Sequence, residues 1–413
     1  MRITDFHITP IAISDPPLLN AAGLHAPYAL RVIVEVVSDD GIYGLGELPG
    51  GADVVADLEA IRHLVVGRDP FRLTAIAMDI EAHFGEMVSG DRNAVRTTIH
   101  SRRAARSFGA VEVACLDLIG KATGRPVCDL LGGRVRDRVE FAAYLFFKYA
   151  GDDEWGEVLT PEQMVDLART FRRRYGFRCL KVKGGVLPPE EEIRTMRLLR
   201  EAFPDCRLRI DPNAVWSVET SLRVAYALRD LDLEYLEDPT PGITGMALVA
   251  QKTHIPLATN MCVTQFEHIP EAVRAGAVQV ILGDHHAWGG LTAYKTLGAI
   301  CETFCLGLSQ HSNTHLGVSM AAMIHAGAAI PQLRYASDTH YPWQTEDIIK
   351  GGKLPIRDGY MEVPTGPGLG VDLDPDQVAK LAELYARRPQ VARDDVTEMR
   401  RRDPTWLPLR PRW

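Results

Sequence analysis

The sequence predicts an α/β protein in which a (β/α)-type barrel follows a smaller α+β domain. Its 413 residues are enough for two domains of ordinary size. Strand patterns joined by a hairpin turn open the chain, and helical patterns follow them. Beyond about residue 130, short apolar runs alternate with helix-like stretches, which is typical of parallel strand–helix units.

The N-terminal part combines a strand region with a helical region. Residues 31–37 (RVIVEVV) and 42–48 (IYGLGEL) flank an Asp-Gly turn, which predicts a β-hairpin. The stretch 15–27 (DPPLLNAAGLHAP) is rich in proline, glycine and alanine, so we expect a long loop there. Helical spacing then runs from about residue 53 to 131, as in 111–119 (VEVACLDLI). These segments together predict the small α+β domain.

Eight apolar runs follow, and helical patterns such as 161–175 and 217–231 separate them. A polar residue lies near the end of each of the six middle runs, 23 to 30 residues from the next, which fits one strand–helix unit per interval. An open doubly wound sheet is the alternative, but eight runs without a GxGxxG motif favour a barrel. The runs are VEFAAYLFF, CLKVKG, RLRID, LEYLED, PLATN, VQVILGD, CLGLSQHS and QLRYAS, and the six polar residues are Lys181, Asp211, Glu237, Asn260, Asp284 and His311.

Composition excludes several classes of function. The net charge of −8 gives no clustered basic surface for nucleic acid. No apolar run is long enough to span a membrane, and the start lacks the layout of a signal peptide, so we expect no membrane partner. The seven cysteines are odd in number and scattered, which favours a reducing cytoplasm and disfavours a thiolate zinc site.

Three oxygen-bearing residues end successive predicted strands: Asp211, Glu237 and Asn260. The carboxyl ends of barrel strands meet at one face, which is where active sites lie. Taken singly, each residue is more often a turn residue or a helix cap. Three on consecutive strands instead favour a site for Mg²⁺ or Mn²⁺.

Lys181 and Lys183 alternate in CLKVKGG, so both side chains leave the same face of their strand. At a barrel strand end, that face points inward. A lysine near a metal ion and a second ammonium is expected to have a lowered pKa, and it could then act as a base near neutral pH. The alternative is an edge strand with two solvated lysines, which the flanking apolar residues and glycines disfavour.

His311 ends the seventh run, and Asp284 ends the sixth. Adjacent barrel strands could bring the carboxylate to the imidazole, orienting it and raising its pKa. A lone histidine is more often structural, but the acid one strand earlier favours a catalytic pair. Periodicity does not choose among His311 and four competitors, His285, His286, His315 and His325.

At these residues the sequence resembles the enolase superfamily, and specifically its glucarate dehydratase branch. The matching motifs occur in the family's order and cover nearly the whole chain, so the set is specific although each motif alone is modest. They are NAAGLHAP (20–27), TTIH (97–100), AYLFF (143–147), KVKGG (181–185), DPNAVWS (211–217), EDP (237–239), TNM (259–261), HSNTH (311–315), DTHYPWQ (338–344) and GPGLG (366–370).

The resemblance implies a (β/α)7β barrel, residues 133–374, under an α+β capping domain, residues 1–132 joined by the C-terminal segment 375–413. It assigns Asp211, Glu237 and Asn260 to Mg²⁺, with Mn²⁺ as an alternative. It places Lys183, with Lys181 beside it, on one face of the substrate and the His311–Asp284 dyad on the opposite face. Substrate contacts are implied for His25, Thr98, Tyr144, Asn213, Asn313 and His340.

The activity implied is dehydration of an acid sugar, D-glucarate, with loss of the β-hydroxyl after removal of the α-proton. The partners expected are a small aldarate and further copies of the chain in a homo-oligomer. Alternatives are another acid-sugar dehydratase or epimerase, for galactarate for example, a Schiff-base aldolase, or a non-catalytic barrel. The chain departs from the branch in the basic stretch 101–110 and at Thr314 and Gly317, where the branch usually has Asn and Asp.

Overall fold

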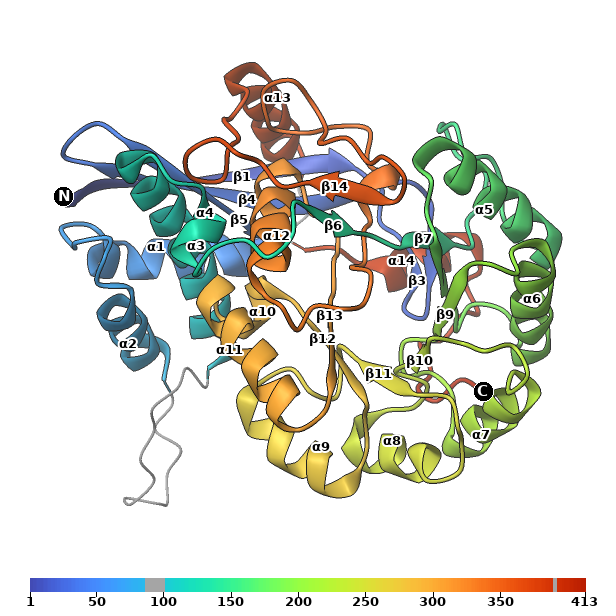
Figure 1. Ribbon diagram of the computed structural model, residues 1–413. Helices are drawn as coiled ribbons and strands as arrows, with labels where there is room; N and C mark the ends of the chain where they lie inside the picture. Colours follow the sequence, from blue (N-terminus) through green and yellow to red (C-terminus); the bar gives the residue numbers. More distant parts are fainter. Residues whose placement is uncertain (86–100, 389–391) are drawn as a thin grey trace.

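The computed structural model describes residues 1–85, 101–388 and 392–413. An antiparallel sheet with its helices lies beside a ring of parallel strands that is enclosed by helices (Figure 1). The predicted combination of an α+β unit and a barrel is confirmed.

The cap sheet has three strands in the order β1-β4-β5. β1 (Ile3–Ser14) pairs antiparallel with β4 (Tyr28–Ser38), which pairs antiparallel with β5 (Tyr43–Pro49). The hairpin predicted from the Asp-Gly turn is therefore confirmed. The loop predicted for 15–27 is only partly correct, because a short hairpin lies within it. Its strands are β2 (Leu19–Asn20) and β3 (Gly23–Leu24).

Helices cover one side of this sheet and form its core. Val32, Val34 and Val36 of β4 share a buried cluster with Leu58 and Ile61 of the first helix. Burying alternate residues of a strand on a helix is the usual way in which a half-buried sheet is stabilised. The helices are α1 (Ala52–Val65), α2 (Leu73–Phe84), α3 (Arg102–Thr123) and α4 (Val127–Leu130).

The basic stretch 101–110 forms the start of α3. Ser101 is the N-cap, and its hydroxyl accepts a hydrogen bond from the Ala104 amide at 3.4 Å. Buried Ala104 and Phe108 pack into the cap core, while the arginines of the stretch remain on its outer side. The stretch is thus the first turns of a regular helix.

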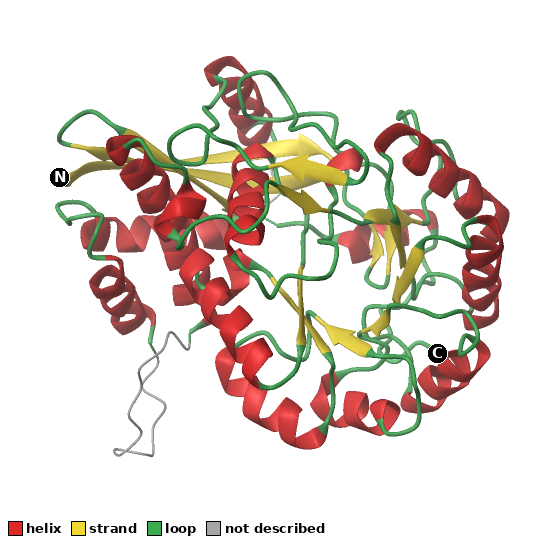
Figure 2. Ribbon diagram, in the orientation of Figure 1, coloured by secondary structure: helices red, strands yellow, loops and turns green. Residues whose placement is uncertain are grey.

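Seven parallel strands form the barrel wall in sequence order from β7 to β13, and helices cover its outside (Figure 2). The strands are β7 (Ala143–Phe146), β8 (Cys179–Lys183), β9 (Arg207–Asp211), β10 (Tyr235–Glu237), β11 (Leu257–Thr259), β12 (Val280–Gly283) and β13 (Gly307–Gln310). The connecting helices are α5 (Pro161–Tyr175), α6 (Pro189–Ala202), α7 (Val218–Ala227), α8 (Gly242–Ala250), η1 (Phe266–His268), α9 (Ile269–Ala275), α10 (His285–Trp288), α11 (Leu291–Thr303) and α12 (Gly317–Ala329).

The eighth predicted run closes the ring through isolated bridges. Ser337 bridges Phe141 on one side, and Leu333 bridges Leu308 of β13 on the other. The Asp338 amide donates to the Gln310 carbonyl at 2.9 Å, which holds the run against the last strand. The run therefore occupies the eighth position without forming a regular strand. Before β7, β6 (Arg138–Glu140) pairs antiparallel with β14 (Tyr360–Glu362), and η2 (Tyr341–Trp343) follows the eighth run.

The C-terminal segment returns to the N-terminal half. α13 (Pro375–Ala386) packs on β1, and α14 (Asp395–Arg402) packs on β3. The final residues reach the barrel, where the Ser217 amide donates to the Trp413 carbonyl at 2.6 Å. Arg412 donates to the carbonyls of Gly185 and Ala21, so the tail joins a barrel loop to the loop that carries β2 and β3.

None of the described helices is both long and apolar enough to cross a membrane. The seven cysteines all fall within the described residues and are free. These seven residues therefore form no disulfide framework.

A buried carboxylate joins the cap to the barrel. Glu112 of α3 accepts hydrogen bonds from the Leu291 and Thr292 amides at the start of α11. Burial raises the pKa of Glu112 to about 7, even though these hydrogen bonds lower it. Its side chain therefore keeps in the native state a proton that the unfolded chain has already released at the same pH.

This linkage predicts how stability depends on pH. Replacing Glu112 with Gln removes a group whose ionisation is disfavoured only in the folded protein. The free energy of unfolding of the unmodified protein should therefore fall relative to that of Glu112→Gln as pH rises from 4.5 to 7, by up to about 3 kcal/mol. Denaturant midpoints across this range would measure it, with exposed Glu201→Gln as the control. Parallel pH profiles of the two proteins would contradict the prediction.

Candidate active site

A polar cavity of about 280 Å³ lies at the carboxyl ends of the barrel strands, next to the loop that carries β2 and β3. A larger cavity of about 460 Å³ also borders Asp284, but three arginines of α3 line it and most of the predicted site residues lie elsewhere. We therefore place the site in the smaller cavity. Its lining residues are Asn20, His25, Tyr144, Phe146, Lys183, Asn213, Asn260, His311, Ser312, Asn313, His340, Arg393 and Asp395.

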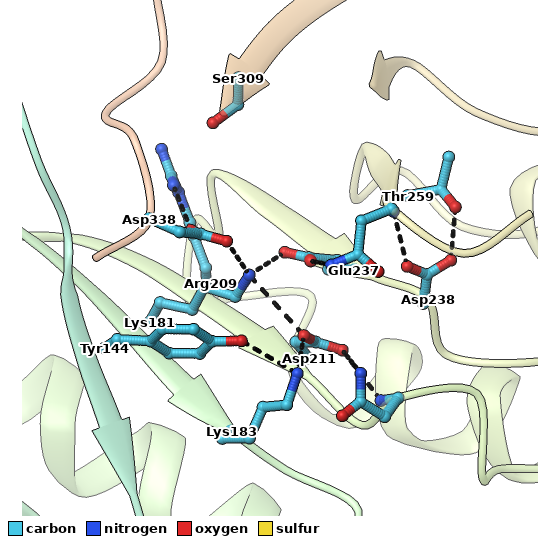
Figure 3. A network of polar contacts seen from close by, with 12 residues as sticks. Tyr144, Lys181, Lys183, Arg209, Asp211, Glu237, Asp238, Thr259, Ser309 and Asp338 are labelled. Carbon is cyan, nitrogen blue, oxygen red and sulfur yellow. Dashed lines mark hydrogen bonds and ion pairs between the residues drawn. The ribbon is translucent and has the colours of Figure 1, made fainter. Parts of the chain in front are cut away.

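The three predicted metal ligands converge. Asp211 ends β9, Glu237 ends β10, and Asn260 directly follows β11. The Asn260 side-chain amide donates to Glu237 Oε1 at 3.0 Å. The ammonium of Lys181 lies 2.6 Å from Glu237 Oε2 and 3.7 Å from Asp211 Oδ2, so both carboxylates face one point (Figure 3).

The electrostatics of this group fit a hard cation. Burial raises the pKa of Glu237 well above its usual range, and the carboxylates of Asp211, Asp338 and Asp238 add to the effect, against the opposing charge of Lys181. A cluster of desolvated carboxylates of this kind is short of positive charge. Two carboxylates and a carboxamide are the oxygen donors that Mg²⁺ prefers. The residues present therefore suit Mg²⁺.

Both lysines of β8 are buried and charged partners surround them. Lys181 lies 2.6 Å from Asp338 Oδ2, and Lys183 lies 2.6 Å from Asp211 Oδ2 and 3.0 Å from the Tyr144 hydroxyl. β8 lies between β7 and β9, so the alternative of an exposed edge strand is wrong.

The protein groups around the lysines shift their pKa upward, whereas a lowered pKa was expected beside a metal ion and a second ammonium. Burial favours the neutral amine of Lys183, but Asp211, Tyr144 and Glu237 together outweigh burial and raise the pKa above its ordinary value. Burial likewise opposes the charge on Lys181, and Asp338 and Glu237 outweigh it. The expected shift took the charge of the second ammonium into account, but not the charges of the carboxylates that the fold brings closer.

The predicted dyad is formed. His311 Nδ1 lies 3.0 Å from Asp284 Oδ2, and His311 borders the cavity. Asp284 directly follows β12 and caps α10 by accepting from the His286 amide at 2.9 Å. Burial disfavours its charge, but His286, His311 and His315 outweigh burial and hold the pKa of Asp284 well below its usual range.

The other candidate histidines fall into two groups. His285, His286 and His315 are buried around Asp284, and only His311 reaches the cavity. His325 lies in α12, where its Nε2 is 3.1 Å from the Leu369 carbonyl, and does not compete for the role. Spacing could not separate His285, His286, His311 and His315, because all four lie within a few residues of a strand end or a helix start.

The predicted substrate contacts line the cavity wherever they are described. The rings of His25 and His340 stack with centroids 5.9 Å apart, and Asp15 lies 3.0 Å from His25 Nδ1. Asn213 has a φ of 52° and donates its amide to Asp211 Oδ1 at 2.9 Å, so its conformation is fixed by a predicted metal ligand. Tyr144 and Asn313 also line the cavity, whereas Thr98 falls outside the described residues.

The departures at Thr314 and Gly317 do not line the cavity. Gly317 begins α12 and donates its amide to Asp347 Oδ1 at 2.8 Å. A Cβ at this position would lie 2.5 Å from Ile349 Cδ1, so packing accounts for the glycine.

Sequence reasoning missed a group of paired charges on the cap side. Arg393 and Asp395 come from the C-terminal segment and line the cavity. Arg393 pairs with Asp395 at 2.6 Å and lies 3.3 Å from Asp15 Oδ2, while Asp395 accepts from the Asn20 side chain at 2.9 Å. A short run of charges near the end of a chain usually lies on the surface, so no local signal marked these residues.

The double glycine after Lys183 has a steric cause. Gly185 has a φ of 71°, and a Cβ on it would lie 2.4 Å from the Pro212 carbonyl oxygen. Buried Glu192 of α6 then holds the turn by accepting from the amides of Gly185, Val186 and Leu187 at 2.8 to 3.0 Å. These hydrogen bonds hold the loop that follows the two lysines in place.

Replacing Glu192 with Ala should release this loop. Three buried amides lose their acceptor, so the free energy of unfolding should fall by about 1–3 kcal/mol. Amide hydrogen exchange at residues 185–187 should accelerate, as measured by mass spectrometry. Glu191→Ala is the matched control, because Glu191 is an exposed neighbour in the same helix. Unchanged exchange at 185–187 would show that Glu192 does not hold the loop.

Two families match the chain. Residues 16–132 match the family described as mandelate racemase / muconate lactonizing enzyme, N-terminal domain. Residues 163–377 match the family described as enolase C-terminal domain-like. The first covers most of the cap, and the second covers most of the barrel strands described above.

Similar proteins extend over the whole chain. "Probable glucarate dehydratase" from Streptomyces coelicolor is 48% identical over 431 aligned positions, which cover 100% of this chain and 99% of that protein. The crystal structure of an enolase from Pseudomonas fluorescens with bound magnesium, potassium and tartrate has a TM-score of 0.94 at 47% identity, covering 100% and 99% of the two chains. An enolase from Mycobacterium smegmatis complexed with tartrate has a TM-score of 0.94 at 49% identity, covering 100% and 98%.

Proposed function

Because the chain belongs to the enolase superfamily, we propose that it is an acid-sugar dehydratase that converts D-glucarate to a keto-deoxy diacid. Membership of this superfamily, expected from the ordered motifs, is confirmed by the family matches and the full-length relatives. The comparisons support an enzyme, and a dehydratase in particular. The observation that carries the finer proposal is that Lys183, His311 and Asn260 line one cavity, with Asp211 2.6 Å from Lys183 and Glu237 3.0 Å from Asn260 just beneath its surface.

The proposed metal ligands are Asp211, Glu237 and Asn260, with Mg²⁺ as the ion. Support comes from their oxygen donors, the buried carboxyl of Glu237, whose ionised form lacks enough positive charge around it, and the magnesium in the related Pseudomonas structure. When bound there, the ion would supply positive charge to a substrate carboxylate, which makes the neighbouring C–H more acidic. A cation at this position would also compete with Lys183 for Asp211, which removes the contact that raises the lysine pKa.

Two proton carriers border the cavity. Lys183 or His311 takes the α-proton, according to the configuration of the substrate at that carbon. Lys181 remains paired with Asp338 and Glu237, and its charge stabilises the anion that forms. Asp284 orients His311 through its contact with Nδ1, so Nε2 is the atom left for the substrate.

Loss of water completes the proposed reaction. The hydroxyl on the carbon next to the deprotonated one leaves, and His311 gives it a proton as the general acid. The enol that results tautomerises to the keto form. The net loss is one water. Where His311 is the base, it passes the α-proton to the leaving hydroxyl; where Lys183 is the base, Lys183 later releases the α-proton to solvent and His311 regains a proton from solvent.

The cap side of the cavity suits a second carboxylate. Arg393 and the stacked pair of His25 and His340 lie there, each from a segment far from the lysines in sequence. Tartrate, which is a diacid, is present in two of the related structures. These observations support a diacid over a monoacid.

We also propose a division into two domains and a homo-oligomeric state. The cap domain comprises residues 1–132 with 375–413, and the barrel domain comprises residues 133–374.

Removing either proton carrier should abolish turnover of D-glucarate. Lys183→Ala and His311→Ala should each lower kcat by at least about 100-fold, because each loses a general acid or base. Keto-acid formation measures the rate, and circular dichroism checks the fold. Exposed Lys252→Ala and His254→Ala are matched controls and should retain activity. Near-normal turnover by either active-site variant would reject the assignment.

Metal removal should have a separate effect. EDTA should abolish turnover, and added Mg²⁺ should restore it. Asp211→Asn should weaken Mg²⁺ binding by at least about tenfold in calorimetry, since one carboxylate ligand is lost. Exposed Asp205→Asn is the control. Full turnover in EDTA, together with trapping of substrate on a lysine by borohydride, would instead support the Schiff-base aldolase.

A further inference from the structure

One histidine of the buried group around Asp284 makes contacts that the proposed reaction does not use. His286 Nδ1 lies 2.9 Å from Asp284 Oδ1, whereas His311 Nδ1 lies 3.0 Å from the other oxygen, Oδ2. Each oxygen of the carboxylate therefore faces a different imidazole. The side chain of His286 is buried, at 3% exposure, so solvent does not replace these contacts.

The far side of His286 leads to the cap domain. His286 Nε2 lies 2.9 Å from the hydroxyl of Ser319 in α12. Arg31 of β4 donates to the same hydroxyl at 3.2 Å, and its Nε donates to Glu47 of β5 at 2.8 Å. Glu47 in turn accepts from the Ser319 amide at 2.8 Å. A continuous set of buried contacts thus runs from a cap ion pair to the dyad.

The donors and acceptors fix the tautomer of His286. Arg31 has only protons to donate, so the oxygen of Ser319 accepts from it. The Ser319 hydroxyl proton then goes to His286 Nε2 at 2.9 Å, which is closer than the Glu47 carbonyl at 3.3 Å. With Nε2 as an acceptor, the ring proton lies on Nδ1, which is next to Asp284 Oδ1 at 2.9 Å in a charge contact whose geometry is not that of a hydrogen bond.

The other charged and titratable groups around this histidine leave that tautomer in place. Burial lowers the pKa of His285 and of His315 well below the ordinary value, so both rings are neutral near pH 7. Arg31 is charged but its charge is balanced by Glu47 within the same pair. The carboxylate of Asp284 is therefore the anion next to the Nδ1 proton of His286.

We propose that His286 is a positioning residue that holds the Asp284 carboxylate in the rotation that His311 requires, and that Ser319 and the Arg31–Glu47 pair of the cap hold His286 in turn. This inference rests on the proposed role of the His311–Asp284 dyad. Without the imidazole, Oδ1 keeps one donor, the backbone amide of residue 286 at 2.9 Å, and a carboxylate held there by that bond alone is less restrained, so His311 loses alignment with the substrate. A misplacement of about 1 Å is enough to cost on the order of 100-fold in rate.

The test compares two substitutions of one residue. His286→Leu removes both ring nitrogens, and kcat for D-glucarate should fall by about 100-fold while KM changes less than about threefold. His286→Asn places an amide N–H where Nδ1 was, so it should recover at least about tenfold of that loss. His325→Leu removes another buried histidine, in α12, and should leave kcat unchanged even where the melting temperature falls.

A second measurement does not depend on turnover. The His311 ring nitrogens can be titrated by ¹⁵N NMR in the unmodified protein and in His286→Leu, with Asp284→Asn as the reference for a dyad without its carboxylate. The titration midpoint of His311 in His286→Leu should move in the direction seen for Asp284→Asn, and His286→Asn should move it back. A midpoint in His286→Leu equal to that of the unmodified protein would overturn the inference.

The two measurements separate this inference from the proposed function. If the unmodified protein turned over no acid sugar, the proposed function would fail, and the NMR midpoints would still decide the role of His286. If the unmodified protein were active and His286→Leu kept full kcat, the inference alone would fail. Equal losses in His286→Leu and His286→Asn, with equal losses of melting temperature, would show a structural role and would also overturn it.

Discussion

The buried ion cluster at the ends of β8, β9 and β10 is the constraint on which the rest of the structure depends. Lys181 and Lys183 are charged in the core, and an unpaired charge there would cost several kcal/mol. Asp211, Glu237 and Asp338 offset that cost through contacts of 2.6 Å. Asp338 directly follows the eighth run, so the segment that closes the barrel also balances the charge of the second strand. The same contact between Asp338 and Lys181 therefore contributes both to closing the barrel and to the charge balance of the site.

Buried glutamates connect the remaining parts of the molecule to that cluster. Glu47 and Glu112 of the cap accept hydrogen bonds from amides at the starts of α12 and α11, and Glu192 accepts from the loop after β8. The first turn of a helix has amides without a partner in the helix, and a carboxylate is a favourable acceptor for them. The cap is thus attached near His311 and the proposed metal ligands through defined contacts, and its C-terminal segment brings Arg393 to the same cavity.

Much of the architecture could be predicted because its signals are local. The Asp-Gly hairpin, the order of the seven strands and the position of each polar strand end follow from patterns of two to seven residues. The short hairpin inside 15–27 was missed because its strands have only two residues each. Arg393 was missed because nothing near it in the sequence marks the cavity it enters. The effect of Asp211 on the pKa of Lys183 was not foreseen, since the distance between the two groups depends on packing between two strands.

The sequence by itself determined which residues stand at the ends of the strands, and so which donors, acids and bases the barrel could present. It did so because periodicity and turn residues act over short distances along the chain. The tertiary structure decided which of those residues touch: which histidine faces the cavity, which carboxylate pairs with each lysine, and which oxygen of Asp284 meets His311. Those choices depend on distances of about 3 Å between residues that are 23 to 378 positions apart, and only the closed barrel with its cap fixes such distances.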